Sequence, residues 1–339
     1  LLIAFKTNGL IHLDAANNYA PEKIEINCGV FSLWKDEQQD IVWIGTDGQG
    51  VYAWTKDEYT FNNLSLNQLP INKRRPIRAI YADPQNTLWL GTKDNGIIRI
   101  EDYDKAKVYS AANVTHFTTQ EGLTNNAVFA FVPSKTHPVL WIGSDGPGLD
   151  YYSYRDHKIH PLVNHTKIGI AKVHSMVEIC DSLLWVGSGS TLLRINVQPK
   201  GNTLEAKSIR SVNLNISNRQ QYNQIYSIYP ENDSIMWIGM RGNGVIRLNI
   251  QTEAYRLITF DKNGIAPMND ILCIHQDRNK NIWLGSSYGL TRLNLLPDGS
   301  FDYKNFNENE GLPNNTIHGI AEDRQGNLWL SSNTGIILF

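Results

Sequence analysis

The sequence predicts an all-β fold, a β-propeller of four-stranded antiparallel blades. Two observations predict it: a tryptophan phrase recurs along the whole chain, and the segments around it read as short strands separated by turns. No segment shows the sustained apolar period of a helix. Self-similarity at this spacing indicates an array of supersecondary units, and four short strands per unit are typical of a propeller blade.

The repeat is anchored by tryptophan, followed by Ile, Leu or Val and then by Gly or Ser. The anchor returns every 44–52 residues and holds seven of the nine tryptophans, and a degenerate copy opens the chain at Leu2–Ala4. The anchors fall near residues 2, 43, 89, 141, 185, 237, 283 and 329. We expect the large flat rings to fill the gaps between blades. The predicted structural residues are Trp43, Trp89, Trp141, Trp185, Trp237, Trp283 and Trp329.

Each unit is predicted to contain four strands in a fixed order. The first is an apolar run such as 77–81, and a polar turn that often opens with Asp follows it, as at Asp83. The tryptophan run is the second strand. A glycine-bearing turn leads to a third strand such as 245–248, and a weaker fourth follows, as at 257–260.

The third position of every first strand is small, and its neighbours are large. Because strand side chains alternate between faces, we expect the small residue to receive a large one from the next blade. The small residues are Ser32, Ala79, Ala130, Ser175, Ser227, Cys273 and Gly319.

Seven first strands predict seven blades, with eight as the alternative because eight tryptophan-type hairpins are present. We interpret residues 1–339 as a single propeller. The chain begins in the middle of a repeat, so we expect it to be a fragment of a longer protein.

Composition excludes several classes of function. The net charge is −2 and the longest basic cluster is 73–75, which argues against a nucleic-acid surface. No apolar run approaches a membrane span. The three cysteines, Cys28, Cys180 and Cys273, are too far apart for a disulfide framework or a zinc site, and Cys180 and Cys273 read as small buried hydrophobes.

No catalytic, metal or cofactor motif is present in the sequence. The histidines His157, His160 and His165 cluster, but they fall on an expected outer edge. We therefore predict no catalytic residue, no metal and no cofactor for this region.

The candidate ligand site is the central mouth, on the loops that enter the first strands. Asn, Arg and Tyr side chains on a rigid frame suit neutral or acidic sugars, although the asparagines of the repeated Gly-Leu-x-Asn-Asn phrase are also typical of turn caps. The candidates are Arg74, Arg75, Asn125, Asn126, Tyr222, Asn223, Asn269, Asp270, Asn314 and Asn315. Trp34, Trp54, Tyr151 and Tyr152 are candidate exposed aromatic contacts, and 196–222 reads as a polar surface insert.

The segments 311–336, 77–100 and 271–294 carry a compound pattern of apolar strand, Asp turn, Leu-Trp-Leu or Ile-Trp-Leu, and Gly-Ile or Gly-Leu, and the first of them opens with Gly-Leu-x-Asn-Asn. This pattern resembles the two-component regulator propeller repeats, over nearly the whole chain. It departs at 2–4, 132–133, 188–192 and 229–230, which makes the blades unequal.

The resemblance implies the periplasmic sensor region of a Bacteroidetes hybrid two-component histidine kinase, an inner-membrane protein. It implies a glycan-derived oligosaccharide ligand and control of polysaccharide-utilisation genes. It also implies a second propeller and a β-sandwich in the same chain and a homodimer. This region would bind no nucleic acid and would reach the membrane only through the rest of the chain.

Two other functions stay open. One is a propeller lyase or glycosidase, for which His174 and His318 on first strands are the candidate catalytic residues. The other is a protein-interaction scaffold, since one fold hosts many functions.

Overall fold

The computed structural model describes the chain as short antiparallel strands joined by turns. It describes residues 2–4, 10–13, 19–24, 28–36, 41–48, 50–55, 62–64, 69, 71, 73, 75, 77–102, 113–179, 182–214, 224–260, 269–296, 300–322, 328–332 and 336–339. No helix among these residues is long and apolar enough to cross a membrane.

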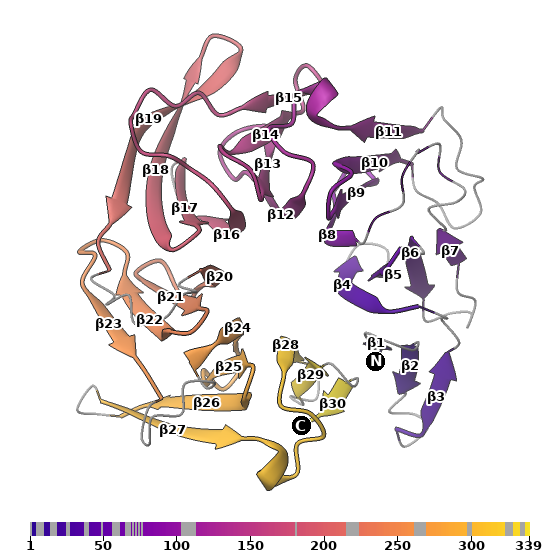
Figure 1. The fold of residues 1–339 in the computed structure, drawn as a ribbon, viewed down its shortest axis with the longest axis vertical. Coiled ribbons are helices and arrows are strands. Elements are labelled where there is room, and N and C mark those ends of the chain that lie inside the picture. The colour runs from indigo at the N-terminus through magenta and orange to yellow at the C-terminus, as the bar shows by residue number, and fades with distance from the viewer. Residues whose placement is uncertain are drawn as a thin grey trace. The chain divides into compact units, whose positions relative to one another are not determined.

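Six sheets have four strands each, and in every one the strands pair in chain order (Figure 1). The first three are β4 (Val30–Asp36), β5 (Ile41–Thr46), β6 (Val51–Thr55) and β7 (Asn62–Leu64); β8 (Ile77–Ala82), β9 (Thr87–Thr92), β10 (Ile97–Glu101) and β11 (Val114–Phe117); and β12 (Val128–Pro133), β13 (Val139–Ser144), β14 (Asp150–Ser153) and β15 (Lys158–Pro161). The other three are β16 (Val173–Glu178), β17 (Leu183–Ser188), β18 (Thr191–Lys200) and β19 (Thr203–Val212); β20 (Ile225–Pro230), β21 (Ile235–Met240), β22 (Gly244–Asn249) and β23 (Tyr255–Ile258); and β24 (Ile271–Gln276), β25 (Ile282–Ser286), β26 (Gly289–Leu295) and β27 (Phe301–Phe306).

Two further sheets have three strands each. They are β1 (Leu2–Ala4), β2 (Leu10–Leu13) and β3 (Pro21–Ile24) at one end of the sequence, and β28 (Ile317–Glu322), β29 (Leu328–Ser332) and β30 (Ile336–Leu338) at the other. Single turns of 3₁₀ helix lie at Thr119–Glu121 and Glu308–Glu310.

The predicted architecture of four-stranded antiparallel blades is confirmed, but the predicted number of blades is wrong. The described residues form six four-stranded blades, not seven and not eight. The sequence count failed because it took each first strand, or each tryptophan hairpin, as a blade. The last first strand, β28, belongs to a sheet of three strands, and the first hairpin, β1–β2, is joined by β3 alone.

The chain divides into two compact units. One contains Leu1–Val173 and Val197–Lys207, and the other contains His174–Asn196 and Ser208–Phe339. In the first unit the first strands β4, β8 and β12 contact one another in sequence, and in the second unit β20, β24 and β28 do the same.

A glycine in the second strand of each blade receives the next blade. A Cβ added to Gly239 would lie 2.7 Å from Cγ2 of Ile271, the first residue of the following first strand. The same contact joins Gly187 to Ile225 at 2.7 Å, and Gly285 to Ile317 at 2.8 Å. The small third residue of the first strand lies opposite this glycine, as Cys273 lies opposite Gly285. Together the two small residues make the recess that admits the large one.

The repeated tryptophans lie inside the sheets. Six of them are at most 5% exposed. They are Trp43, Trp89, Trp141, Trp185, Trp237 and Trp283. The side chain of Trp329 lies outside the described residues.

Candidate functional site

In the predicted asparagine loops, the asparagine side chains accept hydrogen bonds from the backbone of their own loop. Oδ1 of Asn126 accepts the backbone N–H of Thr119 at 2.9 Å, and Oδ1 of Asn315 accepts that of Glu308 at 2.9 Å. Oδ1 of Asn125 accepts the N–H of Ala127 at 2.7 Å. These are Asx-type caps of the turn that precedes the first strand, which is one of the two interpretations that the sequence allows.

Each of these two loops opens with a capping box. Thr118 and Glu121 bond reciprocally around the first 3₁₀ turn, and Asn307 and Glu310 do the same around the second. A glycine at φ 107° (Gly122) or 93° (Gly311) then ends the turn, a conformation that glycine adopts without strain. The capping box and the glycine therefore fix the backbone conformation of both loops.

A buried carboxylate anchors the loop at 122–126. Oδ2 of Asp150 accepts the backbone N–H of Thr124 at 2.9 Å and its hydroxyl at 2.8 Å. Oδ1 of Asp150 is buried and has no hydrogen-bond partner among the described residues. Burial raises the pKa of Asp150 to about 6, against the opposing effect of the two Thr124 hydrogen bonds.

Other residues predicted for the central mouth are buried, paired or outside the described part of the chain. Asn269 is buried, and its Oδ1 accepts the N–H of Phe260 at 2.9 Å. Arg75 forms an ion pair with Asp94 at 2.6 Å. The predicted residues that lie outside the described part of the chain are Arg74, Tyr222 and Asn223.

Asp270 belongs to a polar cluster in the second unit. Its Oδ2 accepts the Ser287 hydroxyl, and Nε of Arg241 lies 3.7 Å from its Oδ1. Arg241 also lies over the Tyr226 ring, 5.9 Å from its centroid, and donates to the Tyr226 hydroxyl at 3.4 Å. The His174 ring meets that of Tyr226 edge to face at 5.6 Å. A carboxylate, a guanidinium and a phenol thus meet at the ends of β20, β21 and β24.

The sequence prediction missed a structural feature that places several of these groups. Six first strands have a β-bulge at their second position, so that residue has no partner in the second strand. Such bulges re-aim side chains and are frequent next to functional sites. The six bulged residues are Phe31, Arg78, Phe129, Tyr226, Leu272 and His318.

The bulged residues differ in chemistry from blade to blade. None of them is fully buried, whereas the preceding residue of each strand is buried. In the first unit, the Arg78 guanidinium lies 4.7 Å from the centroid of Phe31, and its Nε has no hydrogen-bond partner among the described residues. The sequence does contain a signal for these residues. The second position of the first strand varies between repeats, whereas the position before it is always Val or Ile and the position after it is always small.

Candidate aromatic and histidine side chains lie in local pairs, since the Tyr152 hydroxyl lies 2.9 Å from Nδ1 of His157 and the Tyr151 ring lies 5.6 Å from that of His160. Tyr151 and Tyr152 are 1% and 0% exposed, so the hypothesis that they are surface contacts is wrong. Nε2 of His160 lies 2.7 Å from Asp156, and Nε2 of His165 lies 3.1 Å from Glu205. Trp34 is partly exposed and packs edge-on to Tyr81, and the side chain of Trp54 lies outside the described residues.

A groove lies at the other end of the blades. It is lined by the β20–β21 and β24–β25 turns, together with the end of β26 and the start of β27. In antiparallel blades these turns lie opposite the loops that enter the first strands, so the groove is at the opposite end from Asp270 and Asn315. Apart from Trp237, it contains none of the residues proposed from sequence.

Comparison with known proteins agrees with the repeat pattern. The family model for the two-component regulator propeller matches residues 73–94, 266–288 and 311–334. Histidine kinase P4 of Formosa agariphila is 29% identical over 178 residues, which are 51% of this chain and 12% of that protein. These three segments therefore match two-component regulator propeller repeats, in agreement with the resemblance seen in the sequence.

Solved structures share the fold. The extracellular domain of a putative hybrid two-component system from B. thetaiotaomicron matches with a TM-score of 0.64 and 19% identity, over 92% of this chain and 38% of that one. A catalytically inactive virginiamycin B lyase from Staphylococcus aureus matches with a TM-score of 0.62 and 14% identity, over 92% and 95%. At such identities the likeness concerns the fold alone. The chain shares the propeller fold of these structures, and it spans 12% of the Formosa agariphila kinase and 38% of the B. thetaiotaomicron chain.

Proposed function

We propose that this propeller is the periplasmic ligand-sensing region of a hybrid two-component histidine kinase. The observation that carries the proposal is the set of regulator propeller repeats at 73–94, 266–288 and 311–334. The fold similarity to an extracellular two-component domain supports the location. In this proposal the propeller itself catalyses no reaction.

The proposed ligand is an oligosaccharide released from a complex glycan, and the proposed output is control of polysaccharide-utilisation genes. The groups at the ends of β20, β21 and β24 support this ligand class. Tyr226 offers a ring and a hydroxyl, while Arg241 and Asp270 offer a donor and an acceptor. Fixed polar groups beside a ring suit the hydroxyls and C–H faces of a sugar.

Signalling would depend on how the ligand affects two arrangements of a dimer. The proposed assembly is a homodimer whose chains each contain a second propeller and a β-sandwich before the membrane. Ligand shifts such an equilibrium only by its difference in affinity for the two arrangements. A ligand held by groups from two blades can bind the two arrangements with different affinities.

The test is a calorimetric titration of the purified protein with a panel of glycan-derived oligosaccharides. Arg241→Gln and Asp270→Asn should each weaken the binding of the active ligand about tenfold, because each removes a charge-assisted hydrogen bond. The matched control is Gln85→Ala, an exposed change in a turn at the other end of a different blade. The active ligand should also change autophosphorylation of the full-length protein in membranes.

Two results would contradict the proposal. If no oligosaccharide binds and autophosphorylation is unchanged, this is not a glycan sensor. If an oligosaccharide is instead converted to product, and His318→Ala abolishes the conversion, the propeller is an enzyme of the lyase or glycosidase type.

A further inference from the structure

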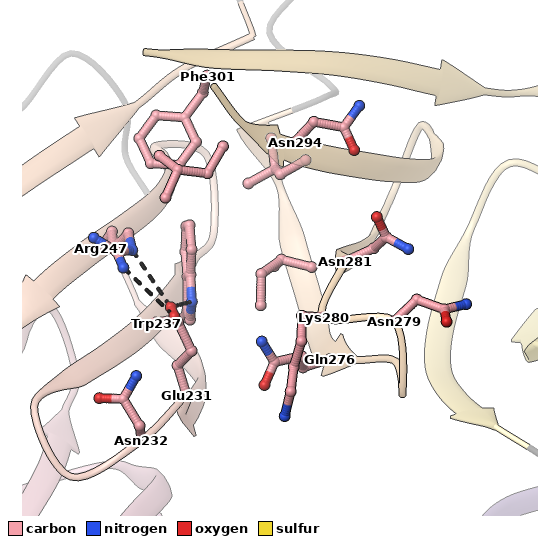
Figure 2. Close-up of a pocket in the computed structure, with 13 residues that line it drawn as sticks. Glu231, Asn232, Trp237, Arg247, Gln276, Asn279, Lys280, Asn281, Asn294 and Phe301 are labelled. Carbon is pink, nitrogen blue, oxygen red and sulfur yellow. Dashed lines mark hydrogen bonds and ion pairs between the residues drawn. The ribbon is translucent and has the colours of Figure 1, made fainter. Parts of the chain in front are cut away.

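The groove in the second unit has the dimensions of a small-molecule site. Its volume is about 500 Å³, and it lies between the sheets β20–β23 and β24–β27 (Figure 2). Small-molecule pockets typically enclose about 300–1,000 Å³. Its walls come from two neighbouring blades of one unit, so their packing fixes its shape.

The charged residues on one wall are already neutralised. Glu231 accepts the indole N–H of Trp237 at 2.7 Å and two N–H groups of Arg247 at 3.4 Å, as the dashed lines in Figure 2 show. The Arg247 guanidinium lies 5.6 Å from the centroid of Trp237. Lys280, on the opposite side, is exposed to solvent. Among the described lining residues, the acid and the arginine are therefore paired with each other, and the remaining cation lies in solvent.

Side-chain amides dominate the remaining polar surface. Among the described residues, the amides of Gln276, Asn279 and Asn294 have no hydrogen-bond partner. Asn281 uses its amide nitrogen to donate to Asp277 at 2.8 Å, which leaves its oxygen to accept. Asn232 uses its oxygen as a turn cap, which leaves its nitrogen to donate. The wall of one cavity thus presents both donors and acceptors.

The apolar part of the groove is a short strip. It consists of Ile282, Leu293, Leu295 and the partly exposed Phe301, whose ring meets Trp237 edge to face at 5.9 Å. An apolar ligand over this groove would remove the three free amides from water without replacing their hydrogen bonds, which is unfavourable. A ligand with many hydroxyls satisfies the amides and lays its C–H groups on the strip.

We infer that this groove is a second binding site, for a short neutral saccharide or a related polyol. It lies at the opposite end of the blades from Tyr226, Arg241 and Asp270, and its argument is independent of the sensing proposal. Its own recognition groups are Gln276, Asn279 and Asn294.

The test is saturation-transfer NMR of the full-length protein with neutral trisaccharides of glucose, mannose and galactose. At least one should give a transfer signal. Gln276→Ala combined with Asn294→Ala should weaken its binding about tenfold or more, because each lost hydrogen bond is equivalent to roughly three- to tenfold in affinity. Asn279→Ala should weaken it about threefold or more, whereas Gln85→Ala, at the equivalent position of the β8–β9 turn, should leave it unchanged.

The mouth variant Arg241→Gln separates the two proposals, because it should leave groove binding unchanged. The inference is overturned if no trisaccharide gives a signal, or if the signal survives the double substitution. It is also overturned if Arg241→Gln removes the signal, or if a blocked Gly-Ser peptide binds the groove where the trisaccharides do not. The last result would identify a peptide site instead.

Discussion

Burial disfavours the ionised form of the Asp150 carboxyl group. It is 0% exposed and has one carboxylate oxygen without a hydrogen-bond partner among the described residues. Its pKa of about 6 in the native state lies above its ordinary value of 3.8. The native protein therefore holds this proton more tightly than the unfolded chain does, and stability falls as pH rises through this interval.

We expect Asp150→Asn to remove a fall in the free energy of unfolding between about pH 4 and pH 6. The loss in the unsubstituted protein is at most about 3 kcal/mol, from the size of the pKa shift. Urea unfolding at pH 4, 5, 6 and 7 measures it as the difference between the two proteins.

A second variant tests the cause. The Thr124 hydroxyl donates to Asp150 at 2.8 Å, and this hydrogen bond lowers the pKa of Asp150. Thr124→Val removes the hydroxyl and should therefore raise that pKa further. The fall in stability should then extend to higher pH. Parallel pH profiles for all three proteins would contradict this account of Asp150.

Gly239 is a residue that cannot gain a side chain without disturbing the next blade. A Cβ there would lie 2.7 Å from Ile271 Cγ2. Gly239→Ala should destabilise the protein by about 1–3 kcal/mol, as overpacked cores do. The control is Gly169→Ala, where nothing lies within 4 Å of the added atom.

A double substitution checks that contact. Ile271→Ala destabilises by leaving a cavity, but combined with Gly239→Ala it should cost less than the sum of the two changes. Thermal unfolding of the four proteins gives the comparison. Strict additivity would show that the two residues do not share this space.

At the scale of the strand hairpin, an acid, the tryptophan and an arginine form a repeated clamp. The indole of Trp89 donates to Asp83 at 3.0 Å and that of Trp283 donates to Asp277 at 2.8 Å. The arginine lies opposite the tryptophan in the third strand, as Arg99 lies opposite Trp89, with its guanidinium 5.3 Å from the ring centroid. The clamp ties the first turn of the blade to its second and third strands.

We expect Trp89→Phe to cost about 1.5–3 kcal/mol more than Trp185→Phe. Both rings are 0% exposed and both lie beside an arginine, but the indole nitrogen of Trp185 has no hydrogen-bond partner among the described residues. The difference is therefore the hydrogen bond from Trp89 to a carboxylate. Chemical denaturation of the two variants measures it, and equal losses would show that ring packing alone matters.

Strands and their order were predictable because they depend on local alternation and turn chemistry. The small third residue, such as Cys273, was also read correctly as a recess for a neighbour. The blade count was not predictable, since whether a first strand such as β28 gains a fourth partner depends on pairing far along the chain. The arginine of the clamp was missed because its link to tryptophan is a cross-strand register, as for Trp89 and Arg99.

The candidate site was less predictable than the fold. Asparagines such as Asn126 and Asn315 looked suited to sugars, but the same chemistry makes them caps of their own turns. The bulged Tyr226 and the groove amide of Asn294 carry no local signature, because each gains meaning only from residues of another blade or turn. Sequence reasoning therefore found the elements, whereas the role of a candidate side chain such as Asn126 depends on contacts that the sequence does not show.

At the scale of the whole molecule, weak net charge sets how binding should respond to salt. The chain carries 31 Lys and Arg residues against 33 Asp and Glu residues. Binding of a neutral oligosaccharide should therefore change less than about twofold between 0.05 and 0.5 M NaCl, because screening acts on charge–charge attraction. Calorimetry across this range measures it. Affinity that falls severalfold would instead indicate an acidic ligand.

The bulges have a consequence for how such a protein can change over evolutionary time. The residues that join blades, such as Ile271 and Gly239, are constrained by each other's shape. The bulged residue beside them has no partner in the ladder, so it can be replaced with little effect on folding. Phe31, Arg78 and Tyr226 occupy the same place in three repeats, yet one is an apolar ring, one a guanidinium and one a phenol. A duplicated propeller can thus acquire a new surface through single substitutions at these positions, while its blades continue to assemble by the inherited pattern.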